Sequence, residues 1–226
     1  MKDWSSWLIR TKEDLEEMVR VFGIVPFIPN AIRGFSIRER VDPKIWFTEE
    51  EGPWEWKGPV IRELGCAYGK FFEKKAAYVR EDVFLDLANY RRDGYDFDAR
   101  VDDELAPVGD AFLYDLLAER APVLSKRLKE AGNYKKGGRK GFDTIITRLQ
   151  EQCYVTVSDF VYETDRFGKP YGWGVAEYST PEKHFGPAFR ENVYRRDPAE
   201  SKERLLDLLK RIHPQTEERI LLRFIK

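Results

Sequence analysis

Apolar residues recur at helical spacing in the N-terminal half of the chain. They predict a helix over residues 11–23, in which Thr11 is the N-cap and Gly23 ends the last turn. A β-rich stretch over residues 66–79 predicts a hairpin, and a second helical face begins at Val83. Residues 42–60 contain prolines, glycines and three tryptophans, so they predict an irregular loop that its aromatic side chains hold in place.

The C-terminal half shows a clearer order of elements. Helical spacing predicts one helix from Asp110, a second over residues 123–131 with Pro122 in its first turn, and a third over residues 139–152. The third has the strongest apolar face, formed by Phe142, Ile145, Ile146 and Leu149. Two β-rich runs, 154–162 and 171–178, predict a hairpin. Its expected buried face consists of Val155, Val157, Trp173 and Val175.

Three helices followed by a hairpin is the order of a winged helix, whose third helix enters the major groove while the hairpin lies against the DNA backbone. We therefore predict an α+β fold of winged-helix type, with three helices plus a β-hairpin wing in the C-terminal half and a mixed α/β N-terminal half packed on it. The predicted domains are an N-terminal α+β part at 1–109, the winged-helix module at 110–180 and C-terminal helices at 181–226. A degenerate winged helix is an open alternative for the first part.

Charge is distributed unevenly along the chain. The 226 residues contain 39 Lys and Arg against 40 Asp and Glu. Residues 126–148 nevertheless hold eight cations and two anions, a net charge of +6, which leaves −7 for the rest of the chain. A cationic segment in a neutral protein is typical of a duplex-binding face. The predicted DNA-binding residues are Lys126, Lys135, Lys136, Arg139, Lys140, Thr144, Arg148, Arg166 and Lys169.

The sequence gives little support for a metal site, an organic cofactor or a membrane span. Its two cysteines and two histidines lie far apart without metal-ligand spacing, and the acids near residue 96 miss the spacing of a calcium loop. We expect no metal and no organic cofactor. Because no apolar run reaches the ~18–20 residues of a membrane span and residues 1–7 lack the apolar stretch of a signal peptide, we expect a cytoplasmic protein without a membrane partner.

Five segments resemble one family of bacterial proteins. They are Trp-Glu-Trp at 54–56, Ala-Tyr-Gly-Lys-Phe-Phe at 67–72, Asn-Tyr-Arg-Arg-Asp-Gly-Tyr-Asp at 89–96, Gly-Phe-Asp-Thr at 141–144 and Tyr-Gly-Trp-Gly-Val-Ala at 171–176. With these segments the chain resembles the short AlkZ-related proteins. AlkZ itself is a larger winged-helix DNA glycosylase that excises alkylated and crosslinked bases. The resemblance implies a related winged-helix scaffold, a DNA substrate and a link to DNA repair, without by itself implying catalysis.

The residues that would carry catalysis do not follow the family pattern. AlkZ glycosylases position the attacking water with a Gln-x-Gln or Gln-x-Asp signature on an early strand, and residues 23–28 offer neither glutamine nor carboxylate. The sequence Gln-Glu-Gln at 150–152 ends the third predicted helix, where we interpret it as facing solvent or backbone. The missing signature therefore favours a protein that is not an enzyme.

Three hypotheses about function remain open. The first is a non-catalytic or catalytically degenerate winged-helix protein that binds double-stranded DNA and is linked to DNA damage. The second is a divergent DNA glycosylase whose base is Asp93, Asp96 or Asp98, beside Tyr90 and Tyr95. Under the first hypothesis these acids would pair with Arg91 and Arg92 on a convex surface. The third is a winged helix that serves protein interaction, including a homodimer.

Overall fold

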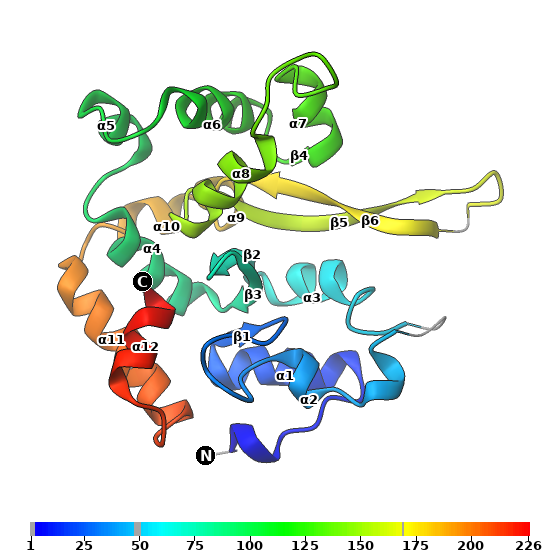
Figure 1. The fold of residues 1–226 in the computed structure, drawn as a ribbon, viewed down its shortest axis with the longest axis vertical. Helices are drawn as coiled ribbons and strands as arrows, with labels where there is room; N and C mark the ends of the chain where they lie inside the picture. The colour runs from blue at the N-terminus through cyan, green and yellow to red at the C-terminus, as the bar shows by residue number, and fades with distance from the viewer. Residues whose placement is uncertain (1–2, 48–50, 169) are drawn as a thin grey trace.

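The computed structural model describes residues 3–47, 51–168 and 170–226. The fold is mixed α+β, as predicted, and its described strands form one antiparallel sheet with helices around it (Figure 1). The strands are β1 (Ile24–Pro26), β2 (Ala67–Phe72), β3 (Lys75–Val79), β4 (Val123–Leu124), β5 (Thr156–Thr164) and β6 (Pro170–Ser179). Their order across the sheet is β1-β3-β2-β5-β6-β4.

The helices around this sheet come from the N-terminal, middle and C-terminal parts of the chain. In the N-terminal part they are α1 (Lys12–Phe22), α2 (Ile37–Arg40), α3 (Lys57–Leu64), α4 (Glu81–Arg92) and α5 (Phe97–Asp102), with short 3-10 turns at Trp4–Ser6 and Pro43–Ile45. The following ones are α6 (Val108–Arg120), α7 (Ser125–Ala131) and α8 (Phe142–Glu151). The last ones are α9 (Pro181–His184), α10 (Pro187–Asn192), α11 (Pro198–Ile212) and α12 (Glu218–Ile225).

Local signals account for several of these elements. Thr11 and Asp14 form a reciprocal capping box at the start of α1, and Gly23 ends that helix in the left-handed conformation. The hairpin of β2 and β3 is also confirmed, because Tyr68 lies opposite Tyr78. The predicted loop over 42–60 is correct only in part, since its last residues begin α3.

The C-terminal half contains the predicted third helix and hairpin, but its second helix starts later than predicted. Residues 123 and 124 form the short strand β4, and Val123 lies opposite Tyr178 of β6. The helical prediction for Val123 was wrong because this long-range pairing outweighs the local preference. The long hairpin of β5 and β6 extends beyond the rest of the sheet (Figure 1).

The predicted burial of Trp173 was also wrong. Val155 and Val157 are buried, whereas Trp173 is 68% exposed. The pairing of β5 with β6 shifts register between Val157 and Asp159 and again between Val161 and Glu163. Each such irregularity changes which face the following side chains take, so strict alternation does not continue into the outer half of the hairpin.

Two groups of buried side chains form the core. The larger lies around β1–β3 and the N- and C-terminal helices. The smaller contains Phe97, Leu113, Leu117, Leu128, Phe142, Ile145, Ile146, Leu149, Tyr154 and Val155. Tyr178 packs against both groups, and Tyr68 of β2 pairs with Val157 of β5. The two halves therefore share one sheet. The domain boundaries expected near residues 109 and 180 stay a prediction.

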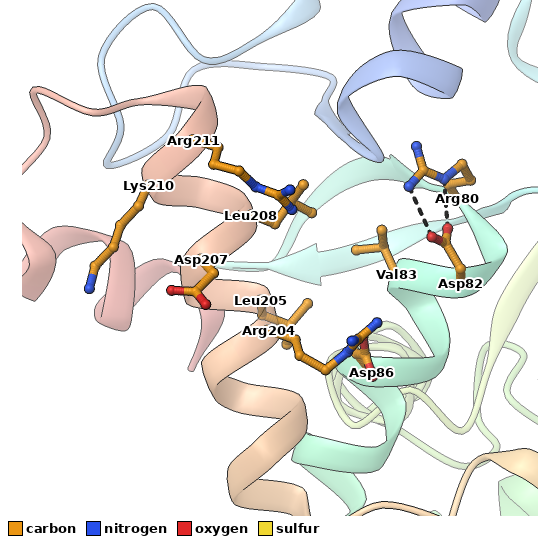
Figure 2. Close-up of a pocket in the computed structure, with 10 residues that line it drawn as sticks. All are labelled: Arg80, Asp82, Val83, Asp86, Arg204, Leu205, Asp207, Leu208, Lys210 and Arg211. Atoms are coloured by element: carbon orange, nitrogen blue, oxygen red, sulfur yellow. Dashed lines mark hydrogen bonds and ion pairs between the residues drawn. The ribbon is translucent and has the colours of Figure 1, made fainter. Parts of the chain in front are cut away.

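A buried carboxylate holds α11 against α4. Asp86 accepts hydrogen bonds from Arg196 Nη1 at 2.9 Å, Arg204 Nε at 2.8 Å and Ser201 Oγ at 3.3 Å. Figure 2 shows Asp86 and Arg204 facing each other across a groove between these helices, with the Arg80–Asp82 ion pair nearby. The charges of this groove largely neutralise one another, so we interpret it as part of the scaffold.

We expect Asp86→Asn to lower the free energy of unfolding by about 1–3 kcal/mol, because the neutral amide weakens three hydrogen bonds, two of them from arginines. Urea denaturation followed by circular dichroism measures this change. Asp207→Asn is the matched control, since Asp207 lines the same groove but is exposed. An equal loss for both variants would contradict the assigned role of Asp86.

Candidate functional site

The link between α7 and α8 presents a compact group of cations. Lys135, Lys136, Arg139 and Lys140 are all exposed within it. Its backbone is folded tightly, because Arg139 N donates to Asn133 O at 2.6 Å and a Cβ at Gly138 would overlap that same carbonyl oxygen. The glycine therefore permits a turn that presents four cations on one surface segment. We call these four residues the basic link.

Ion pairs reduce the charge of the surrounding segment. Lys126 pairs with Glu163 of β5, and Arg148 forms a two-point contact with Asp110 of α6, whose side chain is 2% exposed. Within the basic link, Lys135 pairs with Glu130 at 3.1 Å. Lys136 and Lys140 have no carboxylate within 4.0 Å among the described residues. Three of the predicted DNA contacts, Lys126, Lys135 and Arg148, thus form ion pairs within the protein.

An aromatic ring positions the third cation of the basic link. The Arg139 guanidinium carbon lies 4.0 Å from the centroid of the Phe112 ring of α6. This contact restrains the side chain while the guanidinium N–H groups at its edge stay available to an anion.

Helix α8 exposes less surface than the prediction assumed. Thr144 is exposed near its N-terminus, but Thr147 and Gln150 are buried because α8 packs against α6 on one side and β2 on the other. Gln150 Oε1 accepts from Lys70 N at 2.9 Å, and its Nε2 donates to Ile146 O at 3.0 Å. The interpretation that this glutamine faces backbone is confirmed, and it connects α8 with β2.

The tip of the hairpin carries an exposed cation and an exposed ring. The guanidinium of Arg166 lies 4.7 Å from the ring centroid of Phe167, which is 79% exposed. The predicted DNA contact at Lys169 lies outside the described residues. The basic link and the hairpin tip come from separate segments, and the Lys126–Glu163 ion pair connects α7 with the hairpin.

The three candidate carboxylates occupy two different places. Asp93 ends α4 in the left-handed conformation and lines a pocket with Tyr90, Arg91 and Arg148. Asp96 caps α5, where it accepts from Ala99 N at 2.8 Å, and it lines a second pocket of about 560 Å³ together with Asp98. The prediction that these acids pair with Arg91 and Arg92 was wrong, because both arginines bond elsewhere.

The pocket that contains Asp96 and Asp98 also gathers side chains from distant segments. Its other lining residues are Arg92, Phe97, Tyr114, Asp115, Ala118, Tyr154, Thr180, Glu182, Lys183, Arg190 and Tyr194. We call it the tyrosine pocket. The sequence carries no signal for its rings or for the cations Lys183 and Arg190, since no local motif connects α6, the start of β5 and the helices after β6.

Buried polar groups form one wall of the tyrosine pocket. The fully buried Arg92 donates to Glu182 Oε1 at 2.7 Å and to Tyr194 Oη at 3.1 Å. Burial raises the pKa of Tyr114 and Tyr154, so both phenols stay protonated and can donate hydrogen bonds. Glu182 Oε2 is buried and has no hydrogen-bond partner among the described residues. The pocket thus offers aromatic faces, carboxylates and cations to a ligand.

The part of the chain that the structure describes is free of two features, a cluster of metal ligands and a membrane-spanning helix. Within them, no group of three or more His, Cys, Asp or Glu side chains could hold a metal ion. In the same part of the chain, no helix has the length and apolar character needed to cross a bilayer.

Comparison with known protein families gives a match over most of the chain. The family model described as AlkZ related matches residues 9–226, which is nearly the whole chain. A comparison with curated proteins gave no match, and neither did a comparison with solved structures. The resemblance seen in the five sequence segments is confirmed, and this chain belongs to the AlkZ-related family.

Proposed function

We propose that α6, β4, α7, α8, β5 and β6 form a winged-helix module. Their order along the chain supports this reading, as does the pairing of the short β4 with β6 next to the hairpin. The smaller core group also supports it, since Leu117 of α6, Leu128 of α7 and Leu149 of α8 pack together in it. In this module β5 and β6 are the wing, and α8 stands at the position of the recognition helix.

We further propose that this protein binds double-stranded DNA through the basic link and the wing. The observation that carries the proposal is the presence of four exposed cations on one tight turn of a protein whose net charge is −1. Membership of the AlkZ-related family supports a role in DNA repair. Such cations bind the phosphate groups of DNA, because each contact releases condensed counterions from the duplex.

The geometry of α8 favours binding that is largely independent of sequence. Most of its side chains are buried, and Arg148 is held by Asp110, so few groups are left to read base edges. Phosphate contacts position a protein on DNA without reading its sequence. The acidic remainder of the chain would repel DNA and leave the basic link as the preferred docking face.

We expect the wild-type protein to bind duplex DNA with a Kd of ~10⁻⁴–10⁻⁶ M at physiological salt, as is usual for non-specific binding. Changing Lys135, Lys136, Arg139 and Lys140 to Ala should remove most of this affinity. The slope of log K against log salt should then fall by about 3–4, because up to four phosphate contacts are lost. Fluorescence anisotropy of a labelled duplex at several salt concentrations measures both effects.

A second fourfold variant controls for total charge. It replaces Arg10, Arg33, Arg195 and Arg211, which are exposed arginines outside the proposed face, with Ala. This variant should keep most of the affinity. Equal weakening by both variants would contradict the assignment of the basic link, and no binding by wild type at low salt would favour a protein-interaction module.

A specific observation supports glycosylase activity as a second candidate. Asp96 and Asp98 lie in one pocket with Tyr114, Tyr154 and a cationic rim. Aromatic faces can hold an extruded base, and a carboxylate can activate water for attack at the glycosidic carbon. Glu182 is a further carboxylate in the same pocket.

If the tyrosine pocket catalyses base excision, Asp98→Asn should lower the rate of base release from alkylated duplex DNA by at least 100-fold, as is usual for the loss of a general base. Asp96→Asn tests the other acid, and asparagine can keep the helix cap. Chromatography of released bases is the readout. Asp102→Asn, exposed on the same helix, is the control. Release that none of these changes affects would rule out both acids, and no release by wild type would favour binding alone.

A further inference from the structure

Lys57 is a buried lysine at the start of α3. Its residue is only 9% exposed, although lysines normally keep their ammonium group in water. Its Nζ lies 4.3 Å from the ring centroid of Phe160, 4.8 Å from that of Trp54 and 5.9 Å from that of Phe27. Three aromatic rings from separate segments therefore surround the amine.

No described residue neutralises this amine through a hydrogen bond or an ion pair. Glu55, on the preceding turn, accepts a hydrogen bond from Gly52 N at 3.0 Å. Asp159, on the adjacent β5, pairs with Arg62. The Tyr162 hydroxyl, also on β5, donates to Trp54 O at 3.4 Å. Glu55, Asp159 and Tyr162 are therefore each engaged with a partner other than Lys57.

Two physical effects disfavour a positive charge at this position. Burial removes the ammonium group from water, and the first residue of a helix lies at the positive end of the helix dipole. Burial lowers the pKa of Lys57 to about 8, while Glu55 opposes the shift. The rings stabilise the cation only in part. A substantial fraction of this amine is therefore neutral near physiological pH, and a neutral amine is a nucleophile.

The surface beside Lys57 is aromatic and exposed. Trp54 contacts Trp173 of the wing, with ring centroids 5.6 Å apart. Trp54 also stacks with Phe47, whose ring centroid lies 6.1 Å from that of Trp54 and which is 72% exposed. Exposed rings of this kind stack with unpaired or unstacked nucleobases. The surroundings thus match a nucleic acid whose duplex is locally interrupted.

We propose that Lys57 is a catalytic amine that forms an imine with an aldehyde, namely the open-chain deoxyribose of an abasic site in DNA. The nitrogen lone pair attacks the aldehyde carbon and forms the C–N bond, while the C=O π electrons move to oxygen. Proton transfer from nitrogen to oxygen and loss of water then give the imine, with no change of oxidation state. The choice of an abasic site as the substrate rests on the proposed DNA binding.

Borohydride trapping tests the reaction with DNA. The wild-type protein is mixed with a duplex that contains one abasic site, and sodium borohydride reduces the imine to a stable secondary amine. We expect a covalent adduct that peptide mapping by mass spectrometry assigns to Lys57. Lys57→Met, which keeps an unbranched side chain among the rings, should reduce the adduct at least tenfold. Lys44→Gln, a change at an exposed lysine, should leave it unchanged. An equal yield from Lys57→Met, or an adduct on another lysine, would overturn the proposal.

Reductive methylation of wild type tests the amine without DNA and without a variant. Formaldehyde and a mild borohydride methylate neutral amines, and mass spectrometry follows each lysine from pH 6.5 to 9.5. The methylation rate at Lys57 should rise to a plateau with a midpoint near pH 8. At pH 7.5 its neutral fraction should exceed that of an ordinary lysine roughly 200-fold. A rate at Lys57 that shows no plateau would overturn the proposal.

The two experiments test the reactivity of the amine and the identity of its substrate independently. A plateau at Lys57 together with DNA binding but no abasic adduct would overturn the substrate assignment. A plateau without any DNA binding would support the amine and count against the proposed function.

Discussion

The guanidinium of Arg92 lies without solvent contact at the point where three parts of the chain meet. It comes from α4, donates to the carbonyl of Cys153 just before β5, and pairs with Glu182 of α9. A buried charge is strongly destabilising unless it is paired and hydrogen-bonded. Burial alone would lower the pKa of Arg92, but the Glu182 carboxylate and the Tyr194 hydroxyl together outweigh burial and raise it. The three parts must therefore stay together for this charge to be tolerated.

The tyrosine pocket depends on the same interaction. Tyr154 and Tyr194 both donate to the carbonyl oxygen of Tyr95, and Tyr194 also accepts from Arg92. The Arg92 guanidinium carbon lies 4.7 Å from the ring centroid of Tyr154. A ligand in this pocket would thus contact groups that also determine how the helices after β6 pack on the rest of the fold.

Local sequence signals predicted the elements but not their long-range pairing. The apolar face of α8 and the hairpin that follows it could be read from spacing alone, because both depend on neighbouring residues. The strand at Val123 could not, since it exists through pairing with Tyr178. The charge count of residues 126–148 was similarly incomplete, because Glu163 and Asp110 lie outside that segment. Lys57 shows no sequence signal, since its aromatic neighbours include Phe27 and Phe160 from other segments.

The pairing of β2 with β5 has a consequence for synthesis of the protein on the ribosome. Tyr68 and Thr156, which hydrogen-bond to each other, are 88 positions apart in the chain. At ~5–20 residues per second, roughly 4–18 s pass between the emergence of one and the other. During that time β2 is an open edge of the N-terminal sheet, and its unpaired backbone N–H and C=O groups can pair with a strand of another nascent chain. The wait for β5 is therefore an aggregation-prone interval in the synthesis of this chain.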